Sequence, residues 1–75
     1  GEEVARGNEL ARAVRAALMT IKPDYRTVLV LRHYLQCSYR EMGEILQLPD
    51  KTVKSRLFTA RQMLRDALIG MGIAE

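Results

Sequence analysis

Cysteine, histidine and long apolar runs are scarce in this 75-residue chain, and each scarcity argues against a class of function. The single Cys37 cannot form an internal disulfide, and with the single His33 it falls short of the ligands that a structural zinc site needs. We therefore expect a reducing, cytoplasmic setting, with no metal and no cofactor. No apolar run approaches the roughly 20 residues of a spanning helix, so we expect no membrane insertion.

The residue combinations that carry common catalysis are also missing. The sequence has no Ser/His/Asp arrangement, no paired-carboxylate motif and no glycine-rich phosphate loop. We expect no catalytic residues and no enzymatic activity. We expect Cys37 to act as a small apolar residue that fills space at a helix end. We expect His33 to be a surface or partly packed residue rather than a metal ligand or a pH switch.

The chain is long enough for one small domain, which should bury only about 60% of its unfolded surface. It begins with Gly rather than Met, which favours a boundary inside a longer protein with neighbouring domains beyond it. We expect residues 1–9 to be a linker or helix start. Residues 10–70 should form the folded domain, and 71–75 a C-terminal tail.

Apolar residues recur at three- and four-residue spacing throughout, which predicts helices and no strand. The first predicted helix runs from Glu3 or Asn8 to Thr20, with an inward stripe of Leu10, Val14, Leu18 and Ile21. The second begins near Pro23, which suits a first helical turn, and runs to about Gln36. This second helix has an apolar surface wider than one neighbour could cover, which predicts that it is the central helix. The surface consists of Tyr25, Val28, Leu29, Leu31 and Leu35.

Two further helices are predicted after Cys37. The third starts at Ser38, which has the capping-box spacing to Glu41, and should bury Met42, Ile45 and Leu46. Gly43 within it would let another helix cross very closely. Pro49 breaks the pattern, so the fourth helix begins at Pro49 or Asp50. Its bundle-facing residues are Val53, Leu57, Ala60, Leu64 and Leu68.

Positive charge is concentrated in the fourth helix. Residues 1–50 carry seven basic and seven acidic side chains, whereas 51–65 carry five basic and no acidic ones. Such a face is either a phosphate footprint or a solubilising surface, and charge alone leaves both open. A short helix, a tight turn and a longer basic helix nevertheless predict an all-α, four-helix domain containing a helix-turn-helix, whose second helix enters the DNA major groove.

The outward face of the fourth helix has side chains suited to DNA: Lys51, Lys54, Ser55, Phe58, Thr59 and Gln62. Lysines reach phosphates or guanine, the hydroxyls and the amide bond bases or phosphates, and an aromatic ring can lie against a thymine methyl. Phe58 could instead pack under the C-terminal segment. Arg56 and Arg61 could be tied to the bundle, and the sequence does not separate these options.

Two stretches carry a family resemblance. "IKPDYRTVLVLRHYLQCSYREMGEIL" and "LPDKTVKSRLFTARQMLR" are similar to a Leu-Pro-x-x-x-Arg opening, a Ser-Tyr-x-Glu run and a Pro-x-Gly-Thr-Val-Lys-Ser-Arg recognition helix. Across about residues 10–66 the chain thus resembles region 4 of bacterial sigma factors, most closely the extracytoplasmic-function (ECF) group. The resemblance implies binding of the promoter minus-35 element, docking on the beta flap of the RNA polymerase core during transcription initiation, and regulation by an anti-sigma factor.

Position by position, the resemblance assigns DNA contacts to Thr52, Lys54, Ser55, Phe58 and Thr59, with Tyr39 and Arg40 on phosphates. The chain departs from the family pattern at three positions. Lys51 replaces a usual Gly and Thr59 a common Arg, which should shift base preference. Gln47 occupies a turn position usually held by Gly, and it adds strain if its backbone φ is positive.

Two other interpretations remain open at this stage. A response-regulator or quorum-type output domain also ends in a Thr-Val-Lys helix-turn-helix, but it usually dimerises through an added C-terminal helix, and only five residues follow Gly70. Alternatively, the basic helix docks on an acidic protein partner without touching DNA.

Overall fold

A computed structural model describes the backbone of residues 2–73 and the side chains of residues 7–73. In this part of the chain all regular structure is helical: α1 (Glu2–Met19), α2 (Pro23–Leu29), η1 (Val30–Tyr34), α3 (Tyr39–Leu46) and α4 (Asp50–Gly70). The predicted all-α class with four helices is confirmed. Of the predicted 71–75 tail, residues 74–75 lie outside the described residues.

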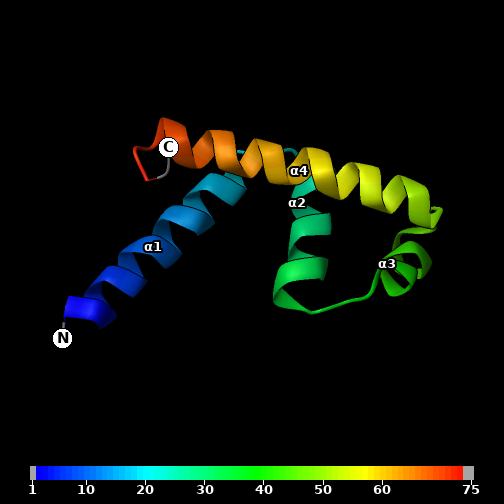
Figure 1. Cartoon of the computed structure of the whole chain (residues 1–75), viewed down its shortest axis with the longest axis horizontal. Coiled ribbons are helices and arrows are strands. Elements are labelled where there is room, and N and C mark those ends of the chain that lie inside the picture. Colours follow the sequence, from blue (N-terminus) through cyan, green and yellow to red (C-terminus); the bar gives the residue numbers. More distant parts are fainter. Residues whose placement is uncertain (1, 74–75) are drawn as a thin grey trace.

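Helix α4 runs along the length of the molecule, and α1, α2 and α3 lie along one side of it in chain order (Figure 1). The carboxyl end of α1 meets the middle of α4, while the amino-terminal half of α1 projects away from the other helices. The result is an elongated molecule with extents of 42, 24 and 17 Å. Helix α3 lies under the amino-terminal part of α4, which is the helix-turn-helix arrangement.

The core forms where α2, α3 and α4 meet. Its largest fully buried side chains are Leu29, Met42, Leu57, Val28 and Val53. Each such side chain stabilises the fold by about 1.5–3 kcal/mol relative to an exposed position. All five were predicted to face inward, Val28 and Leu29 on the second helix, Met42 on the third, and Val53 and Leu57 on the fourth. The prediction that the second helix is central is wrong, because α1, α2 and α3 each pack against α4.

Helix α1 contributes less to this core than its apolar stripe predicts. Leu18 is buried, as is Ile21 just beyond the end of α1, and Val14 is half-buried, but Leu10 remains 45% exposed. The prediction for Leu10 is wrong because this part of α1 diverges from α4 (Figure 1). Helical periodicity places a residue on a face, but it does not supply a neighbour for that face.

The second helix departs from its predicted geometry at its carboxyl end. Residues Val30–Tyr34 form a π-helical turn, in which the Leu35 N–H donates to the carbonyl of Val30 at 3.0 Å. A π turn contains more residues than an α turn, so it changes which side chains share a face. Leu35 therefore lies 63% exposed, contrary to its predicted place on the apolar surface.

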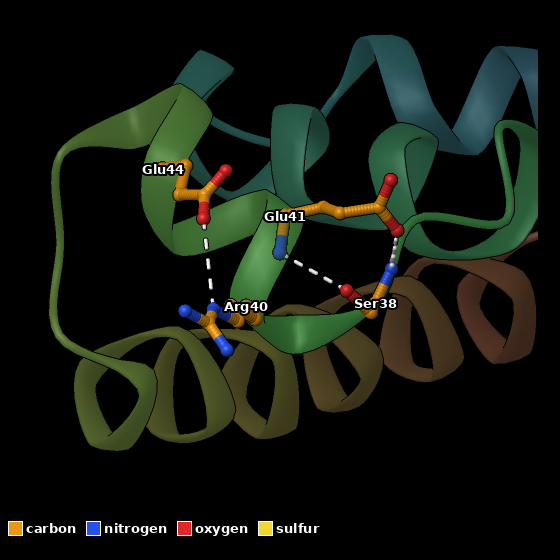
Figure 2. A network of polar contacts seen from close by, with 4 residues as sticks. All are labelled: Ser38, Arg40, Glu41 and Glu44. Carbon is orange, nitrogen blue, oxygen red and sulfur yellow. Dashed lines mark hydrogen bonds and ion pairs between the residues drawn. The ribbon is translucent and has the colours of Figure 1, made fainter.

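Helix α3 begins as predicted. The Ser38 hydroxyl accepts from the Glu41 N–H at 3.0 Å, and the Glu41 carboxylate accepts from the Ser38 N–H at 2.8 Å, which completes the capping box (Figure 2). Met42 is buried as expected, and Leu46 is half-buried, but Ile45 is 57% exposed. The inner face of α3 is centred on Met42, Gly43 and Leu46, and Ile45 lies about 100° away from it around the helix axis.

The turn between α3 and α4 explains Gly43 differently from the prediction. A Cβ at Gly43 would lie 2.7 Å from the carbonyl oxygen of Leu48 and 3.3 Å from Oδ1 of Asp50. The close neighbour is thus the turn itself and the first residue of α4, rather than a crossing helix. Gln47 adopts φ 56° and ψ 49°, so the strain foreseen for a positive φ applies.

Candidate nucleic-acid interface

The predicted DNA-facing residues of α4 do share one side of the helix. Lys51, Lys54, Ser55 and Gln62 are exposed, and Phe58 is 66% exposed. These positions follow the i, i+3, i+4, i+7, i+11 spacing of one helix face. Thr52 and Thr59 are half-buried and lie at the edges of this face. We call this set, Lys51, Thr52, Lys54, Ser55, Phe58, Thr59 and Gln62, the outward face.

The opposite side of α4 anchors the helix. Val53 and Ala60 are fully buried and Leu57 is 1% exposed, while Leu64 and Leu68 are half-buried. The predicted division of α4 into a packing side and an outward face is therefore confirmed for its first three turns. Because the packing side is seated in the core, the outward face is presented on a rigid element.

Phe58 does not pack under the C-terminal segment in the described part of the chain, since two-thirds of its surface is exposed. An exposed aromatic ring at the centre of a basic helix face leaves apolar surface uncovered. Such a side chain is suited to contact with another molecule, and single exposed apolar residues are also ordinary on protein surfaces.

Tyr39, at the first position of α3, is half-buried and lies beside two cations. Its ring centroid is 5.5 Å from Lys54 Nζ and 4.7 Å from Arg32 Cζ. Cations at these distances are attracted to the negative face of an aromatic ring, by about 0.5–1 kcal/mol at exposed sites. The contact with Lys54 joins the start of α3 to the outward face of α4.

Arg40 is exposed next to Tyr39 and is paired along its own helix. Its Nε lies 3.7 Å from the Glu44 carboxylate, with 86% and 72% of the two side chains exposed (Figure 2). An ion pair this exposed contributes little to stability and is easily exchanged for another anion. The Arg40 guanidinium is therefore accessible to a phosphate.

The capping box affects the pKa of Glu41. The hydrogen bond from the Ser38 backbone, and then that of its hydroxyl, lowers the pKa of Glu41 below its usual value. The carboxylate stays ionised at neutral pH at the amino end of α3. It adds one negative charge near the candidate phosphate contacts of Tyr39 and Arg40.

Arg61 and His33 meet between α4 and η1. The Arg61 Nε donates to Nε2 of His33 at 3.2 Å, so the imidazole accepts through an unprotonated nitrogen. Partial burial, and then the positive charges of Arg61 and Arg32, lower the pKa of His33. Of the two options left open for Arg61, attachment to the bundle is the one observed. Arg56 is half-buried, beside the outward face.

Sequence reasoning missed two features of this region. Arg32 was not singled out, yet it donates from Nη1 to the Cys37 carbonyl at 2.9 Å and lies over Tyr39. Gln36 was not expected to adopt a positive φ, which is 60°. Neither residue belongs to a local sequence motif. Their roles become visible only in the conformation of the chain between η1 and α3. Cys37 is half-buried against the core, as expected of an apolar filler.

Other kinds of site find no support in the described residues. Among residues whose side chains the structure describes, no three His, Cys, Asp or Glu side chains gather where they could hold a metal ion. Within residues 2–73, no helix has the length and apolar character needed to cross a membrane. The outward face of α4, with Tyr39 and Arg40 beside it, is thus the arrangement with the clearest chemistry, which is contact with an anionic polymer.

Comparison with known proteins gives a consistent result. Residues 11–64 match the family described as Sigma-70, region 4. The chain is 38% identical over 60 residues to the ECF RNA polymerase sigma factor SigW of Bacillus subtilis, across 80% of this chain and 32% of that protein. It is 34% identical over 61 residues to the RNA polymerase sigma-H factor of Pseudomonas aeruginosa, across 81% and 32% of the two chains.

A third relative is the ECF RNA polymerase sigma factor SigE of Mycolicibacterium smegmatis. It is 36% identical over 67 residues, which cover 89% of this chain and 26% of that protein. The chain therefore spans roughly a quarter to a third of the length of these curated relatives.

Proposed function

This chain belongs to the sigma-70 region 4 family, and we propose that residues 10–70 bind the minus-35 promoter element through the outward face of α4. The observation that carries the proposal is the burial pattern of α4. Lys54, Ser55 and Phe58 are exposed on one side, while Val53 and Leu57, which directly precede Lys54 and Phe58 in the chain, are buried in the core. A rigid helix with a basic, hydroxylated and aromatic face has the chemistry and diameter to enter a major groove about 12 Å wide.

Within this proposal the residues have distinct roles. Lys54, Ser55 and Phe58, at the centre of the face, contact base edges, with Thr52, Thr59 and Gln62 at its flanks. Lys51, Tyr39 and Arg40 contact phosphates. Phosphate contacts set affinity and register, whereas base contacts set sequence preference. The replacement of a family Gly by Lys51 adds a cation to the first turn of α4, where the helix dipole already favours an anion.

We extend the proposal to the longer protein. The names of the relatives support an RNA polymerase sigma factor of the ECF group. We propose that the longer protein directs RNA polymerase to promoters in the cytoplasm. Docking on the beta flap of the polymerase core and sequestration by an anti-sigma factor are part of the same proposal. The exposed apolar residues Leu10, Ile69 and Met71 are surfaces that a protein partner could cover. Family membership displaces the response-regulator interpretation, and the role proposed here is binding rather than catalysis.

The direct test is a fluorescence anisotropy titration of the chain against a promoter duplex and a scrambled duplex of equal length. We expect tighter binding to the promoter. A module that neutralises about four phosphates should show a log–log salt slope of roughly −3.6. Equal or absent binding to both duplexes at low salt would contradict the proposal, and binding to an acidic protein in its place would favour the docking interpretation.

Substitution of Lys54 tests the assignment of the face. Lys54→Ala removes an exposed side chain whose contact with the Tyr39 ring contributes about 0.5–1 kcal/mol, so the chain should still fold. Binding should weaken about fivefold to thirtyfold with relaxed base preference. The same titration checks both quantities. Arg15→Met, on the exposed side of α1, removes an equal charge elsewhere and is the matched control. Unchanged affinity and preference in Lys54→Ala would show that the site is misassigned.

A further inference from the structure

The ring of Tyr39 connects three elements of the molecule. Arg32 belongs to η1, Tyr39 to α3 and Lys54 to α4, and both cations lie within 5.5 Å of the ring centroid. The residues are separated by 7 and 15 positions along the chain, so no local interaction brings them together. The ring is the link between the central part of the bundle and the outward face.

Arg32, the less exposed of the two cations beside the Tyr39 ring, is held in place by the main chain. It is half-buried, and its Nη1 donates to the Cys37 carbonyl at 2.9 Å. A guanidinium bound to the main chain has little freedom, and its planar group is suited to lie over an aromatic ring. Arg32 therefore restrains both the chain between η1 and α3 and the position of the Tyr39 ring.

Lys54 is the more exposed of the two cations beside the Tyr39 ring. Its side chain is exposed, and a lysine loses much conformational freedom when it binds a ligand. A ring that already holds the ammonium reduces that loss. Repulsion from the fixed Arg32 guanidinium also favours Lys54 conformations that point away from the bundle, toward the side where DNA would lie.

We infer that Arg32 is a positioning residue for DNA binding, which acts through the Tyr39 ring to hold the Lys54 ammonium where it contacts DNA. The inference rests on the proposed function of the outward face. Arg32 does not itself touch DNA in this arrangement, because its guanidinium is engaged by the Cys37 carbonyl and by the ring. The residues on which DNA recognition depends would thus include one from η1, outside α3 and α4.

A double-mutant cycle separates this role from a direct contact or a purely structural one. Arg32→Met should weaken promoter binding about threefold to tenfold in the otherwise unchanged chain. In a Lys54→Ala background the same substitution should change affinity less than twofold, because the positioned group is gone. Tyr39→Leu, which removes the ring, should likewise cancel the effect of Arg32→Met. Additive effects in either background would overturn the inference.

Charge loss alone is controlled by Arg15→Met. This exposed residue lies on α1, on the far side of α2 from α3 (Figure 1). Its substitution should lower affinity less than Arg32→Met does, and the reduction should persist in the Lys54→Ala background. If the two arginine substitutions behave alike in both backgrounds, Arg32 acts only through its charge and the inference is wrong.

A DNA-free measurement keeps the inference distinct from the proposed function. In the folded chain, the ring current of Tyr39 should displace the Lys54 ε-methylene proton resonances upfield, and Arg32→Met should move them toward random-coil values. Loss of promoter preference in the unchanged chain would defeat the proposed function and the inference together. Retained preference, with Lys54 resonances at random-coil values in the unchanged chain or unaffected by Arg32→Met, would overturn the inference alone. The resonances of the unchanged chain decide the matter even if Arg32→Met does not fold.

Discussion

The inner and outer sides of the helix-turn-helix unit, formed by α3, its turn and α4, contrast in burial. On the inner side Met42, Val53 and Ala60 have no exposed surface, whereas on the outer side Phe58 is 66% exposed and Lys54 and Ser55 lie in solvent. Inner residues must fit a packed space, so their size and shape are restricted. Outer residues are restricted only by what they bind, which is why departures at Lys51 and Thr59 are compatible with the fold.

Adjacent substitutions in α4 should give the largest contrast. Leu57→Ala removes a core side chain that is 1% exposed, and it should lower the free energy of unfolding by about 2–5 kcal/mol. Phe58→Ala should change it by no more than about 0.5 kcal/mol, since the ring is mostly exposed. Urea denaturation followed by circular dichroism measures both values.

Promoter titration then completes this comparison. Phe58→Ala should bind the promoter duplex more weakly while it remains as stable as the unchanged chain. Similar losses of stability in the two variants would show that the sides of α4 are not separated as described.

Two glycines offer the next contrast. A Cβ at Gly43 would lie 2.7 Å from the Leu48 carbonyl oxygen, whereas a Cβ at Gly70 would have no neighbour within 4 Å. Gly43→Ala should destabilise the domain by about 1–2 kcal/mol, because the main chain of the turn must move and improved helix propensity offsets only part of that cost. Gly70→Ala should be neutral or stabilising by up to about 1 kcal/mol. Thermal denaturation checks both, and equal melting temperatures would rule out the close approach at Gly43.

The turn that joins the two sides should be open to improvement. Gln47→Gly relieves a left-handed backbone conformation at φ 56°, and it should raise the free energy of unfolding by about 0.5 kcal/mol after the larger chain entropy of unfolded Gly is counted. Gln36→Gly, at φ 60°, should behave similarly. Gln62→Gly, inside α4, should instead destabilise by about 1 kcal/mol. A loss of stability in Gln47→Gly would mean that its side chain makes a contact worth more than the strain.

The smallest effect concerns the exposed capping box at the start of α3. The pKa of Glu41 is lower in the folded chain than its ordinary value of 4.5, so its carboxylate stabilises the fold above that pH. This contribution is lost as the pH falls through the lowered pKa. The stability difference between the unchanged chain and Glu41→Gln should therefore be present at pH 7 and shrink below pH 4.5.

Ser38→Ala is the control for that pH dependence. It removes the hydroxyl that accepts from the Glu41 N–H, and should destabilise by about 1 kcal/mol. The Ser38 N–H, which is the main cause of the lowered pKa, remains. Most of the acid-dependent loss should therefore persist in Ser38→Ala. A Glu41→Gln difference that does not vary with pH would contradict this account.

Local signals predicted much of the fold and the candidate site. Pro23 in the first turn of α2, the Ser38–Glu41 capping box and the start of α4 after Pro49 were all confirmed, because each depends on interactions within one helical turn. The exposure of the outward face of α4 was also predicted correctly from periodicity, except that Thr59 is half-buried, as is Thr52, which the family resemblance alone assigned. The role of this face in DNA binding remains a proposal that the titrations above decide.

Predictions failed where a residue needed a particular neighbour. Leu10, Leu35 and Ile45 have the spacing of buried residues but are exposed, since α1 diverges, η1 widens into a π turn and α3 turns another face inward. Gly43 was expected to admit a helix, yet its neighbour is the turn that follows.

Interactions along the chain decide where these helices begin and end and which side of α4 is polar, because propensity, capping and periodicity act over a few residues. Only packing in three dimensions decides which apolar residues are covered. It also decides that Arg32, Tyr39 and Lys54 meet on one ring. Their meeting depends on the angle between helices and on the π turn in η1, and neither is encoded in the spacing of residues along one element.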